Sequence, residues 1–320
     1  MVSEEIQIHG HIIDSLILPK ILDEIMDLGG TFEILEISIG KRKTDPSRAR
    51  LKVSASSSQR LKVILNRLSR LGATPLAPVE ARLERAPRHG VFPPRFYSTT
   101  NLPTAVRVRG RWAPVANIEM DCGIVVDLRR RRARCVPMVH VKQGERVVCG
   151  TQGVRVSPLE RSRAPQAFQF MTSAVSSEKP KAQLIAGVAR AIRQTKREGR
   201  KILLVGGPAI VHTGGGPWLE RLIRAGFVDV VFAGNGMATH DIESALYGTS
   251  LGVSLAHGES AADGHDHHMR AINTIRACGG IRQAIRRRIL RRGIMHACVR
   301  QRVPFVLAGS IRDDGPLPDV

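Results

Sequence analysis

The sequence contains no apolar run that approaches 18 residues and no basic N-terminal region followed by a long apolar core. These absences argue against a membrane-spanning helix and a secretory signal, so we expect a soluble, cytoplasmic protein. The cysteines are odd in number and form no C-x-x-C pair, which argues against a disulfide framework and a structural zinc site. They are Cys122, Cys135, Cys149, Cys278 and Cys298.

Aromatic and acidic residues are also scarce. Aromatic residues make up 4% of the chain, and 28 acidic residues face 49 lysines and arginines, which gives a formal net charge of +21. Much of this excess lies in two arginine-rich stretches, residues 129–134 and 282–292. A basic surface is typical of nucleic-acid-binding proteins, but arginine-rich solvated surfaces are also common. Because few aromatic residues and no recognised motif accompany the charge, the sequence argues against nucleic acid as a partner.

The chain is organised around residues 201–241, which read as strand, glycine loop, helix, strand, glycine loop and helix. The apolar run 202–205 stops at Gly206-Gly207-Pro208, and the run 228–232 stops before Gly234-Asn235-Gly236. Short, wholly apolar runs are typical of parallel strands that are buried on both faces. The stretch therefore predicts two βα units of a Rossmann-like parallel α/β domain.

Both glycine loops are predicted at the carboxyl ends of strands, where open α/β sheets bind ligands. Glycine lets the backbone approach a ligand closely, so Gly207, Gly234 and Gly236 indicate a nucleotide phosphate or ribose site. Their spacing matches neither the G-x-G-x-x-G nor the phosphate-loop pattern, so two ordinary βα turns explain them equally well. A further apolar run, 304–307, leads into an acidic loop with Asp313 and Asp314.

The preceding residues divide into two smaller domains. Alternating apolar residues predict strands at 6–13, 32–39 and 49–55. Segments that end at glycines predict helices at 19–28 and 57–71, and the second carries an apolar stripe at helical spacing. This order of elements is typical of a ferredoxin-like α+β module. Short β-rich pieces follow, including 136–141, and predict a small β-rich middle domain. A long helix is expected at 179–200, with Leu184, Ile185, Val188 and Ile192 facing inward. The predicted domains are residues 1–95, 96–177 and 178–320.

Two clusters carry residue types that are able to do chemistry. Glu119 and Asp121 would share one face of an extended segment, where they could bind an amine or act as a base. A solvated strand face is the more common reason for such a pair. His265 and His268 would share a helical face, but the sequence offers no second cluster of metal ligands. We therefore predict no metal site.

Seven blocks of the sequence carry a family resemblance: RFYSTTNLPT, NIEMDCGIVVD, VSSEKPK, KILLVGGPAIVHTGGGP, VFAGNGMATHDIESALYGTSLGV, HHMRAINTI and FVLAGSIRDDGPLPDV. They resemble the archaeal and cyanobacterial alternative ornithine cyclodeaminases. That family is also known as the conserved region of the bifunctional lysine-oxoglutarate reductase/saccharopine dehydrogenase (LOR/SDH), and it is similar to the C-terminal part of arginine dihydrolase fusions. Family members commonly continue past the position of Val320, so a C-terminally truncated, incomplete Rossmann-like domain is expected. Gly236 stands where the family usually has alanine.

The resemblance implies an NAD-dependent lyase that converts L-ornithine to L-proline and ammonia. We also expect the protein to be a homo-oligomer. It implies that the loops with Asn235, Gly236, Asp313 and Asp314 help to hold NAD, and Gly207 and Gly234 join them as cofactor-binding candidates. The chemistry needs a carboxylate to position and deprotonate an ammonium group. Asp121 and Asp313 are the first candidates, with Glu119 second. Two alternatives remain: a saccharopine- or lysine-type NAD(P) oxidoreductase, and a non-catalytic homologue with a basic, nucleic-acid-binding surface.

Overall fold

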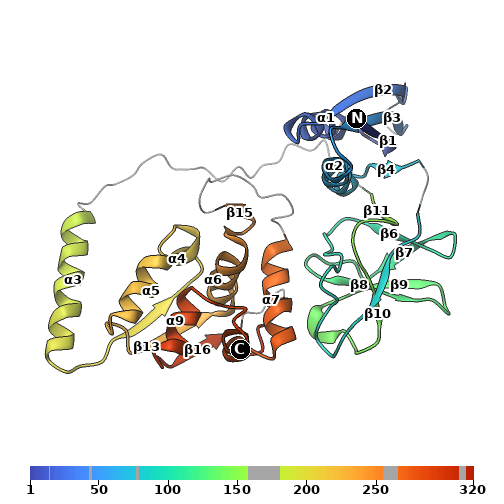
Figure 1. Ribbon diagram of the computed structural model, residues 1–320. Coiled ribbons are helices and arrows are strands. Elements are labelled where there is room, and N and C mark those ends of the chain that lie inside the picture. The colour runs from blue at the N-terminus through green and yellow to red at the C-terminus, as the bar shows by residue number, and fades with distance from the viewer. Residues whose placement is uncertain (14, 43–44, 77–78, 158–180, 255–265, 310–314) are drawn as a thin grey trace. The chain divides into compact units, whose positions relative to one another are not determined.

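A computed structural model describes residues 1–13, 15–42, 45–76, 79–157, 181–254, 266–309 and 315–320. The chain is a mixed α/β protein that forms two compact units, Met1–Ser162 and Arg163–Val320. Figure 1 gives the element labels used below. Within the described ranges, no helix has both the length and the apolar character needed to cross a membrane.

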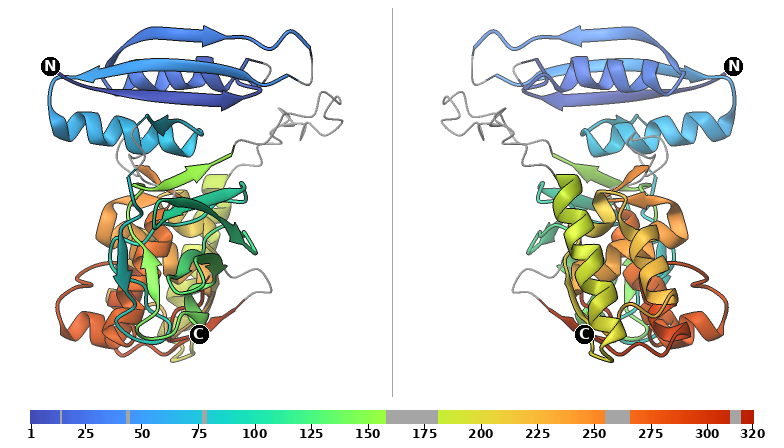
Figure 2. Two further views of the ribbon diagram at one scale, coloured as in Figure 1. Left: turned by 90° about the vertical axis from the view of Figure 1, so that its right-hand side faces the viewer. Right: turned by 90° about the vertical axis from the view of Figure 1, so that its left-hand side faces the viewer.

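The first unit begins with the expected ferredoxin-like module. Its sheet has the strand order β2-β3-β1-β4, in which all of the paired strands are antiparallel. Figure 2 shows the long strands side by side, with the ribbon of α2 below them. The short final strand was not predicted. The elements are β1 (Val2–Gly10), α1 (Ile17–Asp27), β2 (Thr31–Ser38), β3 (Ser47–Ala55), α2 (Ser58–Arg70) and β4 (Thr74–Pro75).

Both helices of this module cover the same face of the sheet. Ile8 on β1 and Leu51 on β3 are fully buried against Ile21 of α1 and Ile64 of α2. The side chain of Ser57 accepts a hydrogen bond from the backbone N–H of Arg60, which explains why α2 begins at Ser58. The outer strand β2 remains open, and its apolar side chains Ile34, Leu35 and Ile37 are exposed.

The rest of the first unit is a seven-stranded mixed sheet with the order β11-β6-β7-β9-β8-β10-β5. The strand predicted at 136–141 is wrong, because β9 ends at Val136 and a 3-10 turn follows. Pro137 has no N–H to continue the ladder. Strand β7 was not predicted. The elements are β5 (Leu83–Arg85), β6 (Thr104–Val108), β7 (Arg111–Ala116), β8 (Gly123–Asp127), β9 (Arg132–Val136), η1 (Met138–His140), β10 (Arg146–Val148) and β11 (Val154–Val156).

The second unit contains the expected Rossmann-like parallel sheet, with the strand order β12-β13-β16. Its strands alternate with helices, as the pattern of residues 201–241 predicts. The elements are α3 (Lys181–Arg197), β12 (Leu203–Gly206), α4 (Ala209–His212), α5 (Gly216–Arg224), β13 (Val230–Gly234), α6 (Asn235–Tyr247), β14 (Thr249–Ser250), β15 (Val253–Ser254), α7 (His267–Cys278), α8 (Ile281–Arg286), α9 (Ile294–Arg300) and β16 (Phe305–Ala308).

One face of this sheet is covered and the other is exposed. Side chains alternate along a strand, so Val231 and Leu307 are buried whereas their neighbours Phe232 and Val306 are exposed. The expectation that these strands are buried on both faces is therefore wrong for the residues that the structure describes. The inward orientation expected for α3 is also wrong, because no described element covers its apolar side. Its exposed residues include Leu184, Ile185 and Val188.

Candidate functional site

The carboxyl ends of the three parallel strands meet at one edge of the sheet. Gly206 at the end of β12 pairs in register with Ala233, and Gly234 at the end of β13 pairs with Ala308 of β16. Helix α6 begins directly after Gly234, so the free N–H groups of its first turn lie at this edge. The structure thus brings the candidates Gly207, Gly234, Asn235 and Gly236 close to one another.

The candidate glycines leave open space. A Cβ atom at Gly207 or Gly234 would meet no atom within 4 Å, and one at Gly236 would meet only Pro208, at 3.9 Å. Gly206 differs, because a Cβ there would lie 2.9 Å from Ile210 and from Met237. The loops therefore have room for a ligand to approach the backbone. The positive N-terminus of a 13-residue helix beside that space suits the pyrophosphate of a dinucleotide.

Asn235 connects two of the loops. Its side chain is 4% exposed, donates a hydrogen bond from Nδ2 to the carbonyl oxygen of Gly315 and accepts one at Oδ1 from the backbone N–H of Leu317. These bonds are 3.2 Å and 3.0 Å long, and they hold the segment after the acidic loop against the start of α6. Asp313 and Asp314 themselves lie outside the described residues.

The carboxylate pair Glu119 and Asp121 belongs to the first unit, in the turn between β7 and β8. The expected extended segment is wrong, because Asp121 has a φ of 58°, in the left-handed region. Thr99 holds this turn. Its hydroxyl donates to the carbonyl oxygen of Glu119 and accepts from the N–H of Cys122, while its own carbonyl oxygen accepts from the N–H of Asp121. Glu119 is exposed and Asp121 is half-buried.

Two buried thiols next to this turn escaped the sequence prediction. Cys122 and Cys135 share a hydrogen bond, which lowers the pKa of Cys135 to about 6 and raises the pKa of Cys122. The hydroxyl of Thr99 lies 3.7 Å from the sulfur of Cys135 and also lowers its pKa. Nothing in the spacing of the two cysteines, 13 positions apart, marks them as a pair, because the pairing of β8 with β9 brings them together.

A buried polar network on α6 also escaped the sequence prediction. Glu243 is completely buried, and it accepts hydrogen bonds from the hydroxyl of Thr249 at 2.8 Å and the N–H of Gly252 at 3.1 Å. Burial raises the pKa of Glu243, but the hydrogen bonds from His240, Gly252 and Thr249 outweigh it and hold the pKa below its usual value. This network fixes the β14–β15 hairpin to α6. The sequence does not mark Glu243, because α6 also carries the polar residues His240, Asp241 and Ser244.

The histidine cluster has no described metal-binding arrangement. His265 lies outside the described residues, and His268 lies in the first turn of α7. Among the residues that the structure places, no three His, Cys, Asp or Glu side chains gather as ligands for an ion.

The arginine-rich stretches lie on two separate surfaces. Residues 129–131 form the turn between β8 and β9, where Asp127 accepts hydrogen bonds from the N–H groups of Arg129 and Arg130. The second stretch lines an open hollow of about 900 Å³ on the second unit, and no acidic residue is among its described lining. Its basic members are Arg224, Arg282, Arg286, Arg288, Arg291, His296, Arg300 and Arg302.

Three family models match successive parts of the chain. The LOR/SDH bifunctional enzyme conserved region matches residues 3–102, and the first region of the C-terminal part of arginine dihydrolase ArgZ-like proteins matches residues 103–185. The Rossmann fold of the same C-terminal part matches residues 186–320.

Curated relatives match the chain from end to end. The ornithine cyclodeaminase of Methanothermobacter thermautotrophicus is 55% identical over 321 residues, which cover 100% of this chain and 78% of the relative. The enzyme of that name from Methanopyrus kandleri is 51% identical and covers 99% of this chain and 77% of its own length. The crystal structure of the ternary complex of AgrE with ornithine and NAD⁺ matches with a TM-score of 0.83 and 40% identity. That match covers 99% of this chain but 45% of AgrE.

Proposed function

Because this chain belongs to the family of ornithine cyclodeaminases, we propose that it converts L-ornithine to L-proline and ammonia with NAD as its cofactor. The observation that carries the proposal is the 55% identity to an archaeal ornithine cyclodeaminase along the whole chain. When bound, NAD would supply the hydride chemistry: it would accept a hydride from the α-carbon of ornithine and return it to the cyclic imine that remains after the δ-amine has displaced ammonia, so no net NADH is formed.

The edge of the parallel sheet supplies a suitable place for the dinucleotide. Gly207, Gly234 and Gly236 give the pyrophosphate access to the backbone, and the N-terminus of α6 supplies N–H groups and a favourable dipole. Asn235 acts as a positioning residue, because its side chain fastens the segment at Gly315 to the start of α6. We assign Asp314, in the loop just before that segment, to cofactor binding as well.

The amine groups of ornithine require a carboxylate that binds an ammonium group and accepts its proton. We propose Asp121 and Asp313 for this role, with Glu119 as the second choice. The bonds from Thr99 support Asp121, because they fix the backbone of its turn and so limit the directions in which its side chain points. Glu119 lies in the same turn but is exposed, whereas Asp121 is half-buried, which makes Glu119 the second choice.

The deciding experiment supplies the purified protein and NAD with ornithine, lysine or saccharopine in separate reactions. We expect proline and ammonia in equal amounts from ornithine and no accumulation of NADH. A pocket distinguishes substrates that differ by one methylene by about 1–3 kcal/mol, so slow conversion of lysine is compatible with the proposal. Stoichiometric NADH from saccharopine, with no proline from ornithine, would establish the alternative oxidoreductase.

Three further assignments belong to this proposal. The three family regions support a division of the chain into domains at 1–95, 96–177 and 178–320. All five cysteines are free thiols, which suits the reducing environment of the cytoplasm. The open, apolar edge of β2 suits pairing with a second copy of the chain, and we therefore propose a homo-oligomer.

A further inference from the structure

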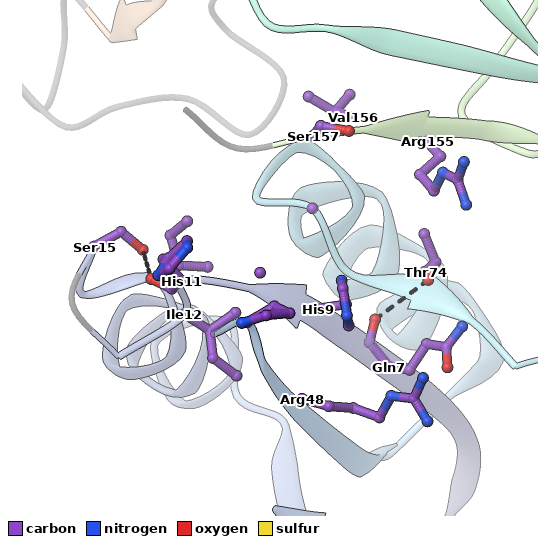
Figure 3. Close-up of a pocket in the computed structure, with 14 residues that line it drawn as sticks. Gln7, His9, His11, Ile12, Ser15, Arg48, Thr74, Arg155, Val156 and Ser157 are labelled. Atoms are coloured by element: carbon purple, nitrogen blue, oxygen red, sulfur yellow. Dashed lines mark hydrogen bonds between the residues drawn. The ribbon is translucent and has the colours of Figure 1, made fainter. Parts of the chain in front are cut away.

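A basic hollow in the first unit has no role in the proposed reaction. Its volume is about 590 Å³, which is enough for a small organic molecule. Figure 3 shows that its lining comes from β1, the turn before α1, β3, β4 and the end of β11. The hollow therefore draws side chains from both sheets of the unit.

The charge of this hollow has one sign. The basic side chains of His9, His11, Arg48 and Arg155 line it, and its described lining contains no aspartate or glutamate. Figure 3 shows Arg48 on the β3 side of the hollow and Arg155 on the β11 side. Because both side chains border the hollow, their positive charges favour an anion inside it.

Arg48 differs from the next arginine on its strand. Arg50 lies on the same face of β3 and forms ion pairs with Glu5 and Glu36, at 3.1 Å and 3.4 Å. Within the described part of the chain, Arg48 has no such carboxylate partner. The guanidinium of Arg155 lies 4.6 Å from the centre of the Trp112 ring, a contact that restrains its position. The hollow thus combines an unpaired cation with a second, oriented one.

Neutral hydrogen-bonding groups complete the lining. Ser15, Thr74 and Ser157 carry hydroxyls, and Gln7 carries an amide. Ile17, the first residue of the 11-residue helix α1, also borders the hollow, so the positive end of that helix lies at its rim. These groups are suited to the several oxygen atoms of a carboxylate or phosphate group.

We propose that this hollow is a second binding site that takes a small dianion with two negatively charged oxygen groups, a dicarboxylate or a phosphate. The same features exclude the basic amino acids as ligands of this hollow. Ornithine, lysine and arginine each carry a side-chain cation, and the described lining offers no carboxylate to bind it. The site is therefore distinct from the site of the proposed substrate.

The test measures binding of succinate and of inorganic phosphate to the full chain by calorimetry, at one fixed ionic strength and without NAD or ornithine. We compare the wild type with Arg48→Gln, Arg155→Gln and the control Lys52→Gln. Lys52 lies on the same strand and face as Arg48 but outside the hollow, so the control removes the same charge. Thermal unfolding of each variant verifies that it is folded.

We expect at least one probe to bind the wild type and the Lys52→Gln variant equally, and each arginine variant to bind it about tenfold or more weakly. Binding of succinate alone identifies a dicarboxylate site, and binding of phosphate alone identifies a phosphate site. Excess ornithine must leave the affinity unchanged. No binding tighter than about 1 mM, or equal weakening by all three substitutions, would overturn the proposal. Because no turnover is measured, the result is independent of the proposed enzymatic activity.

Discussion

Asp241 is a buried carboxyl group whose substitution makes a distinctive prediction. It lies on α6, is 4% exposed and accepts hydrogen bonds of 2.8 Å from the N–H groups of Ile294 and Met295 at the start of α9. Burial raises its pKa from 3.8 to about 7, despite these two bonds, and the nearby charge of Glu220 adds to the rise. The protein therefore favours the neutral form of this group.

The raised pKa makes the stability of the protein depend on pH. The contribution of Asp241 to the free energy of unfolding is fully present below pH 3.8 and is lost as the pH rises through about 7. The difference between the two pKa values corresponds to about 4 kcal/mol at about 1.4 kcal/mol per pKa unit. Asp241→Asn removes this titration. It also replaces one acceptor oxygen by an NH₂ group, which leaves a buried N–H unpaired at a cost of about 1–3 kcal/mol.

We therefore expect Asp241→Asn to have a lower free energy of unfolding than the wild type in acid. Between about pH 5 and about pH 8, the free energy of unfolding of the wild type should fall by about 3 kcal/mol relative to that of the variant. Urea unfolding at several pH values measures this difference. A Trp112→Phe background leaves Trp218 as the only tryptophan, so fluorescence reports on the second unit. Parallel stability curves for the two proteins would refute the assignment of a raised pKa to Asp241.

Four other substitutions and one titration test the remaining assignments. Asn235→Ala should weaken NAD binding by about tenfold, because the two bonds that fasten Gly315 and Leu317 are lost; unchanged affinity in calorimetry contradicts the positioning role. Asp121→Asn should lower turnover of ornithine about 100-fold or more and leave the affinity for NAD unchanged. Glu119→Gln, which removes the neighbouring carboxylate, is the matched comparison. Ile37→Lys should produce monomers in light scattering, and an unchanged mass excludes the edge of β2 as the interface. Binding of the protein to DNA should vanish on a salt titration, and binding that survives about 200 mM salt favours the nucleic-acid alternative.

The sequence predicted those parts of the fold that depend on local periodicity. The strands and helices of the ferredoxin-like module and the βα units after residue 201 follow from apolar spacing and from glycines. Strand β4 has two residues and β7 contains Pro114, so neither carries a recognisable pattern. The exposure of Leu184 and Val205 was not predictable, because the same apolar run occurs whether or not another element covers it.

The candidate site was predictable only where it follows the ends of strands. The positions of Gly207, Gly234 and Gly236 at one edge follow from the parallel order of the strands. The bonds between Asn235 and Leu317, and between Asp241 and Ile294, join residues that are 82 and 53 positions apart. Contacts of this kind depend on tertiary packing and leave no periodic signal. The turn at Asp121 was missed because its left-handed backbone depends on Thr99, from a distant part of the chain.

The most direct test of the proposed reaction uses ornithine that carries deuterium at the α-carbon, incubated with the protein and unlabelled NAD. If the hydride is taken from the α-carbon and returned to the same carbon of the cyclised intermediate, the proline formed retains the deuterium. Mass spectrometry of the product should then show labelled proline, one ammonia for each proline, and no deuterium accumulating in NADH. Unlabelled proline, or labelled NADH in amounts equal to the ornithine consumed, would contradict the proposal.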